Sequence, residues 1–147
     1  MRKLWVIIVL LAASLFIVPS RMDAFHSKEQ QQQGLSKYLW QQEKLFQITT
    51  YWVDLKVVSK GDMKDKSAWG DTYFDDKGAH IEIMDANDMP FQLSQKERGK
   101  FQHEILQHEV LHIYMSAHGV PDELQDPLIH LVQPYMKGNH DVSYGRP

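Results

Sequence analysis

The stretch His108-Glu109-Val110-Leu111-His112 constrains this chain more than any other part of its sequence. In an α-helix, residues four apart lie on the same face, so the two histidines project side by side with Glu109 next to the first. Two imidazoles and a carboxylate in this arrangement can bring together a zinc ion, a water molecule and a general base. The pattern therefore predicts a helix at this position and a zinc hydrolase as the function. Five residues can also match by chance, so the surrounding sequence has to support the interpretation.

The flanking residues predict that the motif lies on a long helix. Ser94 and Glu97 form a capping-box pattern, and His118-Gly119 followed by Pro121 is typical of a helix end. We therefore expect a helix from about Ser94 to residue 117. Apolar residues occur on both sides of its last two turns, which indicates a central helix packed on a sheet behind and covered by another element in front.

The remaining segments predict an α+β fold. We expect a helix at 35–46, strands at 48–58, 68–74 and 79–84, and a last helix that begins at Asp126. The glutamine-rich segment 27–33 is typical of a spacer or a poorly packed helix start. Pro134 is expected to kink or break the last helix. Together these elements predict a small antiparallel or mixed sheet packed on a central HExxH helix with flanking helices.

The first 24 residues are expected to be a signal peptide or an N-terminal membrane anchor. Arg2 and Lys3 precede a run from Leu4 to Val18 that is apolar except for Ser14. That run is short for a membrane-spanning helix but has the length of an export signal. Residues 25–147 then form one globular domain, and the location is extracytoplasmic, either secreted or anchored through an uncleaved N-terminal segment.

Composition narrows the chemistry. The chain contains no cysteine, which excludes disulfides, thiolate zinc ligands and a cysteine nucleophile. Its 16 basic and 19 acidic residues give a net charge of −3 at pH 7, which argues against nucleic acid as a partner.

A hydrolytic zinc site needs three protein ligands and an open coordination position, so a third ligand must follow the motif. We favour His130, a polar ring among apolar neighbours on the last predicted helix, over the alternative of a core histidine bonded to the backbone. His118 fits better as a helix-end histidine that bonds to the last carbonyls. Three carboxylates remain as oxygen-ligand alternatives, although Asp126 is more simply an N-cap and the other two are loop residues: Asp122, Glu123 and Asp126.

With these residues in place, the chain resembles a minimal zincin metallopeptidase of gluzincin-like connectivity over residues 48–137. The resemblance implies that His108 and His112 bind zinc and that Glu109 is the catalytic base that assists attack of a zinc-bound water on a peptide bond. It also implies that the strand before the active helix, 79–84, lines the cleft and pairs with an extended peptide or protein substrate. Two departures are present. Gluzincins usually have a glutamate where His130 stands, and the glycine of the metzincin branch is replaced by Met115.

Several supporting residues are left open. Glu104 lies one turn before His108 and could orient that ring, although an exposed helix charge is the simpler interpretation. Donors that could help to hold the oxyanion of the reaction are Tyr135, His140 and Tyr144.

The leading hypothesis is an exported zinc peptidase, and two other classes compete with it. One is a noncatalytic, zinc-stabilised extracytoplasmic binding module, for which Glu109 would be dispensable. The other is a membrane-anchored interaction module in which the five-residue pattern is accidental, and such a module would bind no zinc.

Overall fold

The computed structural model describes residues 26–90 and 92–136, which form three helices and a three-stranded sheet. The helices are α2 (Lys28–Phe46), α3 (Gln95–Ala117) and α4 (Asp122–Met136). The strands are β1 (Val53–Val58), β2 (Gly70–Asp75) and β3 (Gly78–Met84), with short 3₁₀ turns at Lys60–Asp62 and Ala86–Asp88. The predicted α+β class is confirmed, whereas the expected signal or anchor over 1–24 lies outside the described residues. Within the described part, no helix is both long and apolar enough to cross a membrane.

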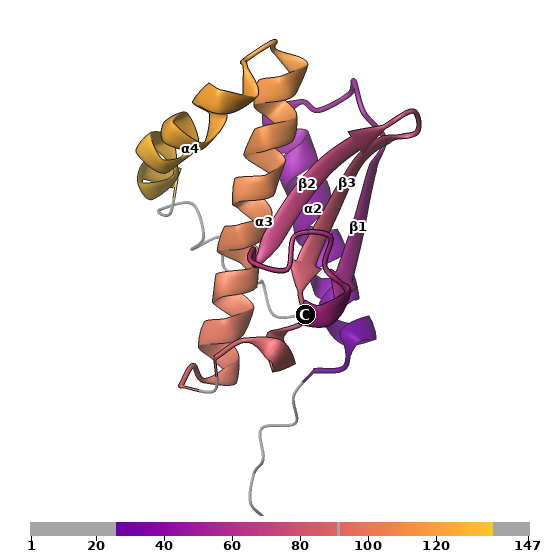
Figure 1. Cartoon of the computed structure of the whole chain (residues 1–147), viewed down its shortest axis with the longest axis vertical. Helices are drawn as coiled ribbons and strands as arrows, with labels where there is room; N and C mark the ends of the chain where they lie inside the picture. Colours follow the sequence, from indigo (N-terminus) through magenta and orange to yellow (C-terminus); the bar gives the residue numbers. More distant parts are fainter. Residues whose placement is uncertain (1–25, 91, 137–147) are drawn as a thin grey trace, which may run out of the picture.

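The sheet has the order β1-β3-β2, with β3 parallel to β1 and antiparallel to β2 (Figure 1). Segment 79–84 was expected to line the cleft and to pair with an extended substrate. This pairing was wrongly predicted, because β3 is hydrogen-bonded to β1 on one edge and to β2 on the other. The strand beside α3 is β2, which joins β3 through a hairpin in which the Asp75 carboxylate accepts the N–H groups of Lys77 and Gly78. The sheet edge next to the motif helix is therefore that of β2.

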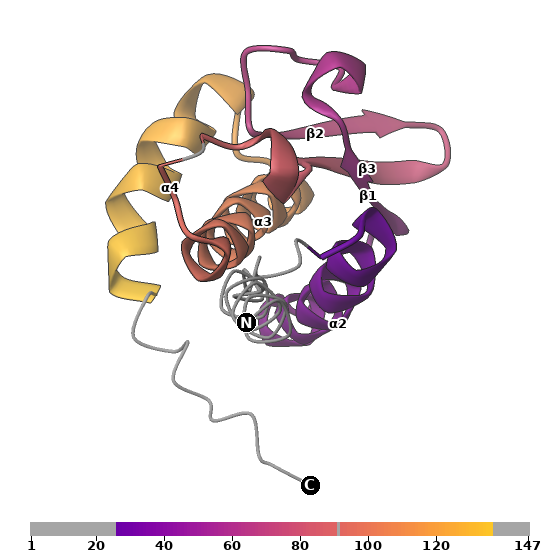
Figure 2. The same ribbon diagram turned by 90° about the horizontal axis from the view of Figure 1, so that it is seen from below.

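Helices α2 and α3 cover the same face of the sheet, as the view in Figure 2 shows. Their shared core contains ten buried residues: Leu35, Tyr38, Leu39, Leu55, Ala79, Ile81, Ile83, Leu106, Val110 and Ile113. Burial of one large aliphatic side chain contributes about 1.5–3 kcal/mol, so this layer fixes α3 firmly on the sheet. Of the three described helices, α3 has the most buried residues, and it is the helix that carries the motif.

The glutamine-rich segment forms the first turns of α2, so the expected helix start is confirmed and the spacer alternative is not. Ser27 caps the helix in a capping box with Gln30, which satisfies backbone N–H groups at its start. Gln31 is buried, accepts the backbone N–H of Ala86 and donates to a carboxylate oxygen of Asp85. Only the expected poor packing was wrong, because composition alone treats glutamine as a solvated residue, whereas the Gln31 amide completes a buried hydrogen-bond network.

Helix α3 begins where the capping box predicts. The Ser94 hydroxyl accepts the N–H of Glu97, and the Glu97 carboxylate accepts the N–H of Ser94. The helix runs to Ala117, with α2 and the sheet on one side and α4 on the other (Figures 1 and 2). Its predicted central position is confirmed.

Helix α4 begins at Asp122, one turn earlier than expected, so Asp126 is not its N-cap. It also continues past Pro134 to Met136 and is not broken there. A proline removes the hydrogen bond to the carbonyl four residues earlier. The residues that carry those carbonyls, Glu123 and His130, are exposed, so water can satisfy them.

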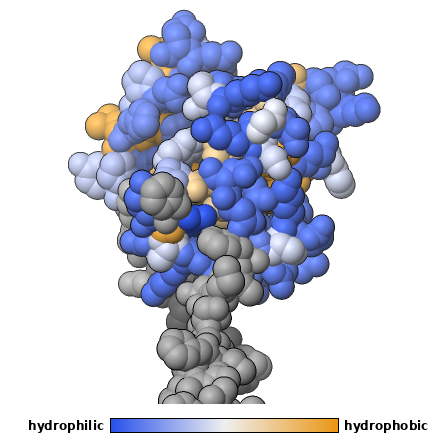
Figure 3. All heavy atoms as spheres, turned by 60° about the horizontal axis from the view of Figure 1, so that its bottom comes forward, coloured by the Kyte–Doolittle hydropathy of each residue, from blue (hydrophilic) through white to orange (hydrophobic). Residues whose placement is uncertain are grey.

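The outer face of α4 carries an exposed apolar stripe, and Figure 3 shows hydrophobic side chains gathered at the left edge of the molecule, where α4 lies. The stripe consists of Leu124, Leu128, Leu131, Val132 and Tyr135. On the inner face, Gln125 and Ile129 are the buried residues of this helix. A narrow inner face, half of it polar, therefore holds α4 against α3.

Candidate metal centre and catalytic cleft

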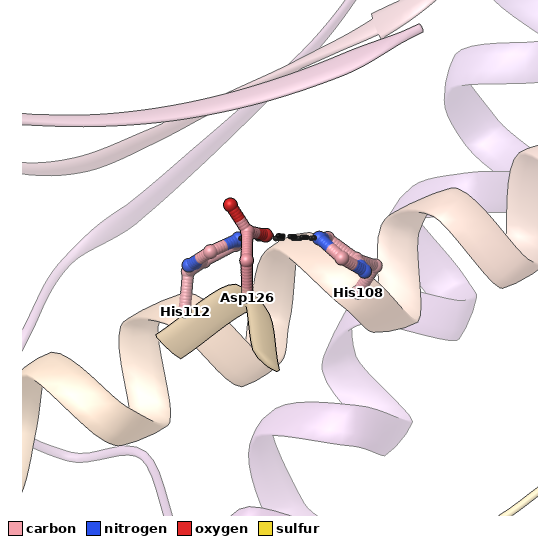
Figure 4. Close-up of side chains that lie close together, drawn as sticks. All are labelled: His108, His112 and Asp126. Carbon is pink, nitrogen blue, oxygen red and sulfur yellow. Dashed lines mark hydrogen bonds and ion pairs between the residues drawn. The ribbon is translucent and has the colours of Figure 1, made fainter. Parts of the chain in front are cut away.

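Three side chains converge between α3 and α4. His108 and His112 project from one face of α3 toward Asp126 of α4, as Figure 4 shows. The Nε2 atoms of the two rings lie 3.2 Å apart, and Asp126 Oδ1 lies 3.2 Å from the first and 3.3 Å from the second. These atoms form a nearly equilateral triangle of two ring nitrogens and a carboxylate oxygen.

The size of this triangle fits a tetrahedral zinc ion. Zinc binds histidine nitrogen at about 2.0–2.1 Å and carboxylate oxygen at about 2.0–2.2 Å, so two ligand atoms at a tetrahedral angle are about 3.3 Å apart. Two imidazoles and one carboxylate are also a common ligand set of catalytic zinc sites. In both size and chemistry, His108, His112 and Asp126 fit the ion that the motif predicts.

The other nitrogen of each ring lies against a glutamine of α4. His112 Nδ1 is 2.9 Å from Gln125 Oε1, and His108 Nδ1 is 3.4 Å from Gln133 Oε1. Burial and the neighbouring His112 lower the pKa of His108, which favours its neutral, ligand-competent form. A neutral imidazole with its proton on Nδ1 presents a lone pair at Nε2.

Glu109 is the buried acid of the site. Its residue exposure is 6 %, and Thr72 Oγ1 of β2 donates to its Oε2 at 2.8 Å. Burial raises the pKa of Glu109 to about 7, although the Thr72 hydrogen bond and His112 act in the opposite direction. Such a carboxyl group can exchange a proton near neutral pH.

Gly70 of β2 makes room for this carboxylate. A Cβ atom at this position would lie 2.7 Å from Glu109 Oε1 and 2.3 Å from Ile105 Cγ2, both closer than side-chain contacts allow. Glycine lets the strand backbone approach α3 closely. The edge of β2 and the motif helix thus come together at Glu109.

A cleft of about 610 Å³ opens over these groups between β2, α3 and α4. Its lining residues are Asp65, Ala68, Gly70, Asp71, Thr72, Tyr73, Phe74, His108, Glu109, His112, Asp122, Gln125 and Asp126. Five of these are acidic and none is lysine or arginine, so the described lining is negatively charged. The cleft has the size of a small-ligand or peptide-segment site.

The residue that lies beside the two histidines is Asp126, not His130, which the sequence favoured as the third ligand. Asp126, which the sequence assigned to an N-cap, joins the two histidines. His130 lies one turn further along α4, is exposed and has its ring centroid 5.5 Å from that of His108, but it is not part of the metal-competent group. His118 is at the end of α3, where its Nδ1 is 2.7 Å from the Tyr114 carbonyl oxygen, as expected of a helix-end histidine.

The remaining described candidates are not members of the group that could hold a metal ion, and two candidates lie outside the described residues. Asp122 and Glu123 form the first turn of α4 and are not loop residues. The ring of His108 contacts Gln133 and Asp126, and the backbone carbonyl of Glu104 accepts a hydrogen bond from Gln133 Nε2. Among the oxyanion-donor candidates, Tyr135 is 87 % exposed on the outer stripe of α4. His140 and Tyr144 lie outside the described residues.

Four supporting residues were not predicted from the sequence: Gly70, Thr72, Gln125 and Gln133. A signal for the glutamines exists, because Gln125, Ile129 and Gln133 recur at intervals of four and so share one face of a helix. The signal is visible only if the helix begins before residue 125. Thr72 and Gly70 reach Glu109 through tertiary packing that local spacing does not encode.

Comparisons with protein-family models, curated proteins and solved structures give no match for this chain. The proposal for its function therefore rests on the geometry of the site.

Proposed function

We propose that this protein is a zinc-dependent peptidase in which His108, His112 and Asp126 hold the metal and Glu109 is the general base. The observation that carries the proposal is the triangle of three ligand atoms with edges of 3.2, 3.2 and 3.3 Å, next to a buried glutamate in an open cleft. Two ring nitrogens and a carboxylate oxygen at this spacing are electron-rich atoms. A cation between them would relieve their mutual repulsion.

The chain's own residues supply the acid-base chemistry. Bound zinc would polarise the scissile carbonyl and lower the pKa of a water molecule at the open position. Glu109, with a pKa of about 7, accepts the proton of the attacking water and returns it to the leaving amine. Thr72 fixes one carboxylate oxygen, which keeps the base in one orientation during both transfers.

The cleft suits an extended peptide. Within the described part of the chain, β2 pairs with β3 alone, so its outer edge can bond a substrate strand along Gly70–Phe74. The acidic lining favours substrates with positive charge. An extracytoplasmic location, secreted or anchored through residues 1–24, completes the proposal on the basis of the sequence.

The decisive experiment measures zinc binding and hydrolysis in the same preparations. We expect the chelator-treated full-length chain to bind one zinc ion in calorimetry and to cleave members of a mixture of quenched fluorescent peptides. Glu109→Gln should keep its zinc and lose activity by about 10²- to 10⁴-fold, because it removes the base and no ligand. Glu123→Gln is the matched control and should behave like the parent. A parent that binds no zinc contradicts the proposal.

The identity of the third ligand is tested by alanine variants of two α4 residues. Loss of a residue that only supports a ligand typically raises the Kd for zinc by about 10- to 100-fold. Asp126→Ala should raise it by more, because it removes a ligand. His130→Ala should change it far less, since its ring lies outside the triangle. The opposite result would assign the third position to His130, as the sequence alone favoured.

A noncatalytic, zinc-stabilised module is the second candidate, and one observation favours it. The histidines belong to α3 and Asp126 to α4, so an ion would cross-link two helices that share a narrow interface. For this function, Glu109→Gln would bind zinc like the parent, and neither protein would cleave the peptides. The peptidase proposal requires that the parent cleaves them and that Glu109→Gln does not.

A further inference from the structure

The contacts of Gln125 and Gln133 point to a function beyond holding α4 in place. We infer that these two glutamines are positioning residues that fix the tautomer of both histidines, so that each Nε2 lone pair faces Asp126. This inference rests on the proposed metal centre, which it deepens by assigning the groups that orient the ligands.

The orientation of the Gln125 amide is fixed by its acceptors. Gln125 Nε2 lies 2.9 Å from the Val120 carbonyl oxygen, 3.0 Å from Asp122 Oδ1 and 3.1 Å from Ser116 Oγ. A backbone carbonyl and a carboxylate can only accept hydrogen bonds, so the NH₂ group must face them. The amide oxygen is thereby directed toward His112, 2.9 Å from its Nδ1.

Gln133 repeats this arrangement two turns later. Its Nε2 donates to the backbone carbonyl of Glu104 at 2.8 Å, which directs Oε1 toward His108 Nδ1 at 3.4 Å. The longer distance indicates a weaker contact than that of Gln125 with His112. Gln125 and Gln133 lie on either side of Ile129 on the inner face of α4, which accounts for their matching directions.

An amide oxygen cannot donate a hydrogen bond, so each histidine must carry its proton on Nδ1. In neutral imidazole, the other nitrogen then has a lone pair, and in both rings this nitrogen is the Nε2 atom that lies within 3.3 Å of Asp126. Each backbone carbonyl thus determines an amide orientation, and each amide determines a tautomer. The docking of α4 and the geometry of the ligands are coupled through these two side chains.

The test is the tautomeric state of each histidine, read from imidazole ¹⁵N chemical shifts in the metal-free full-length chain at pH 8. In the parent, both rings should be protonated on Nδ1. Gln125→Met should release this preference at His112 and leave His108 unchanged, and Gln133→Met should do the reverse. Gln107→Met, which removes an equally buried glutamine of α3, is the matched control and should affect neither ring.

Zinc affinity gives the second readout. Gln125→Met should raise the Kd for zinc by about 10- to 100-fold and Gln133→Met by less, in line with their contact lengths. If the glutamines only dock α4, each substitution would alter both rings together, as undocking by Ile129→Ala should, and that result would overturn the inference. Rings protonated on Nε2 in the parent would also overturn it. Failure of the proposed function differs from both, because a chain without zinc affinity can still show the two Nδ1 tautomers.

Discussion

Within the described residues, histidine rings lie beside aspartate carboxylates at two places, and the two arrangements differ in what surrounds the rings. On the open face of the sheet, His80 of β3 has Asp75 Oδ2 3.0 Å from its Nε2 and Asp54 Oδ2 3.6 Å from its Nδ1. Tyr73 stacks on the same ring, with the two centroids 5.0 Å apart. Both nitrogens of this histidine therefore face a negative charge, which is the environment of an ion pair.

In the cleft, the ratio of histidine to aspartate is reversed. Two histidines share one aspartate, and their Nδ1 atoms face neutral amide oxygens. The Nε2 atoms are left to converge with the carboxylate. In the first arrangement two carboxylates lie beside one ring, whereas the second brings two ring nitrogens and one carboxylate oxygen close to one point in space. The partner of the second ring nitrogen, more than the presence of Asp, distinguishes a structural histidine from a candidate ligand.

Strand β2 separates the two arrangements. Gly70 and Thr72 face Glu109 and the cleft, while Tyr73 and Asp75 contact His80 on the opposite face. This division follows from the alternation of side chains along a strand. Substitutions on one face of β2 can therefore be compared with substitutions on the other.

The largest expected difference between the two places is the response to zinc. With free zinc at 1,000 times its Kd, the ion should stabilise the parent by about 4 kcal/mol, because it binds the folded chain. His112→Ala should remove this gain by removing a ligand. His80→Ala is the matched control, and zinc should still raise its thermal unfolding midpoint.

Differential scanning calorimetry with and without zinc makes this comparison. A zinc response that vanishes in His80→Ala and persists in His112→Ala would move the metal site to the open face of the sheet.

A smaller effect on stability is expected from a substitution at Gly70, where β2 approaches α3. Gly70→Ala places a methyl group against Ile105 and the Glu109 carboxylate, and overpacking of this kind costs about 1–3 kcal/mol. We expect the free energy of unfolding in urea to fall by this amount, with loss of peptidase activity as Glu109 is displaced.

Gly99→Ala is the control for this substitution. Gly99 is an α3 residue at which an added Cβ meets no atom within 4 Å, and alanine favours a helix interior over glycine by about 1 kcal/mol. This variant should be at least as stable as the parent. Equal destabilisation by the two alanines would mean that the close approach at Gly70 does not matter.

Local patterns predicted α3 well because its signals are local. The capping box at Ser94, the stop after Ala117 and the position of the two motif histidines all depend on residues within a few turns of one another. The start of α4 was mispredicted because Asp126-Pro127 is a strong N-terminal pattern, yet it lies in the second turn of the helix.

The mispredicted start of α4 also led to the preference for His130 as the third ligand. With the helix start at Asp126, the aspartate is occupied as a cap and His130 becomes the natural ligand. With the start at Asp122, the Asp126 side chain is free to face α3, and Gln125 joins the inner face. Thr72 and Gly70 could not be predicted in any case, since their contacts with Glu109 span more than 30 residues of sequence and depend on the sheet order.

The smallest expected effect is a change in the pH dependence of stability, caused by a substitution at Asp75 on the open face of the sheet. The hydrogen bond with His80, together with the N–H of Lys77, holds the pKa of Asp75 below its usual range. A carboxyl group whose pKa is lowered by folding stabilises the folded state above its unfolded pKa of about 3.9, and this contribution is lost as the pH falls through the folded value. Asp75→Asn removes the contribution. The difference in unfolding free energy between parent and variant should therefore narrow between about pH 5 and pH 2.

Urea unfolding across this pH range measures that difference, with Asp76→Asn of the same turn as the control. Zinc affinity should be the same in all three proteins, because Asp75 faces away from the cleft. A difference that is independent of pH would show that the charge of the Asp75 carboxylate does not contribute to stability, and would contradict this prediction. A change in zinc affinity would instead show that the two faces of β2 are coupled.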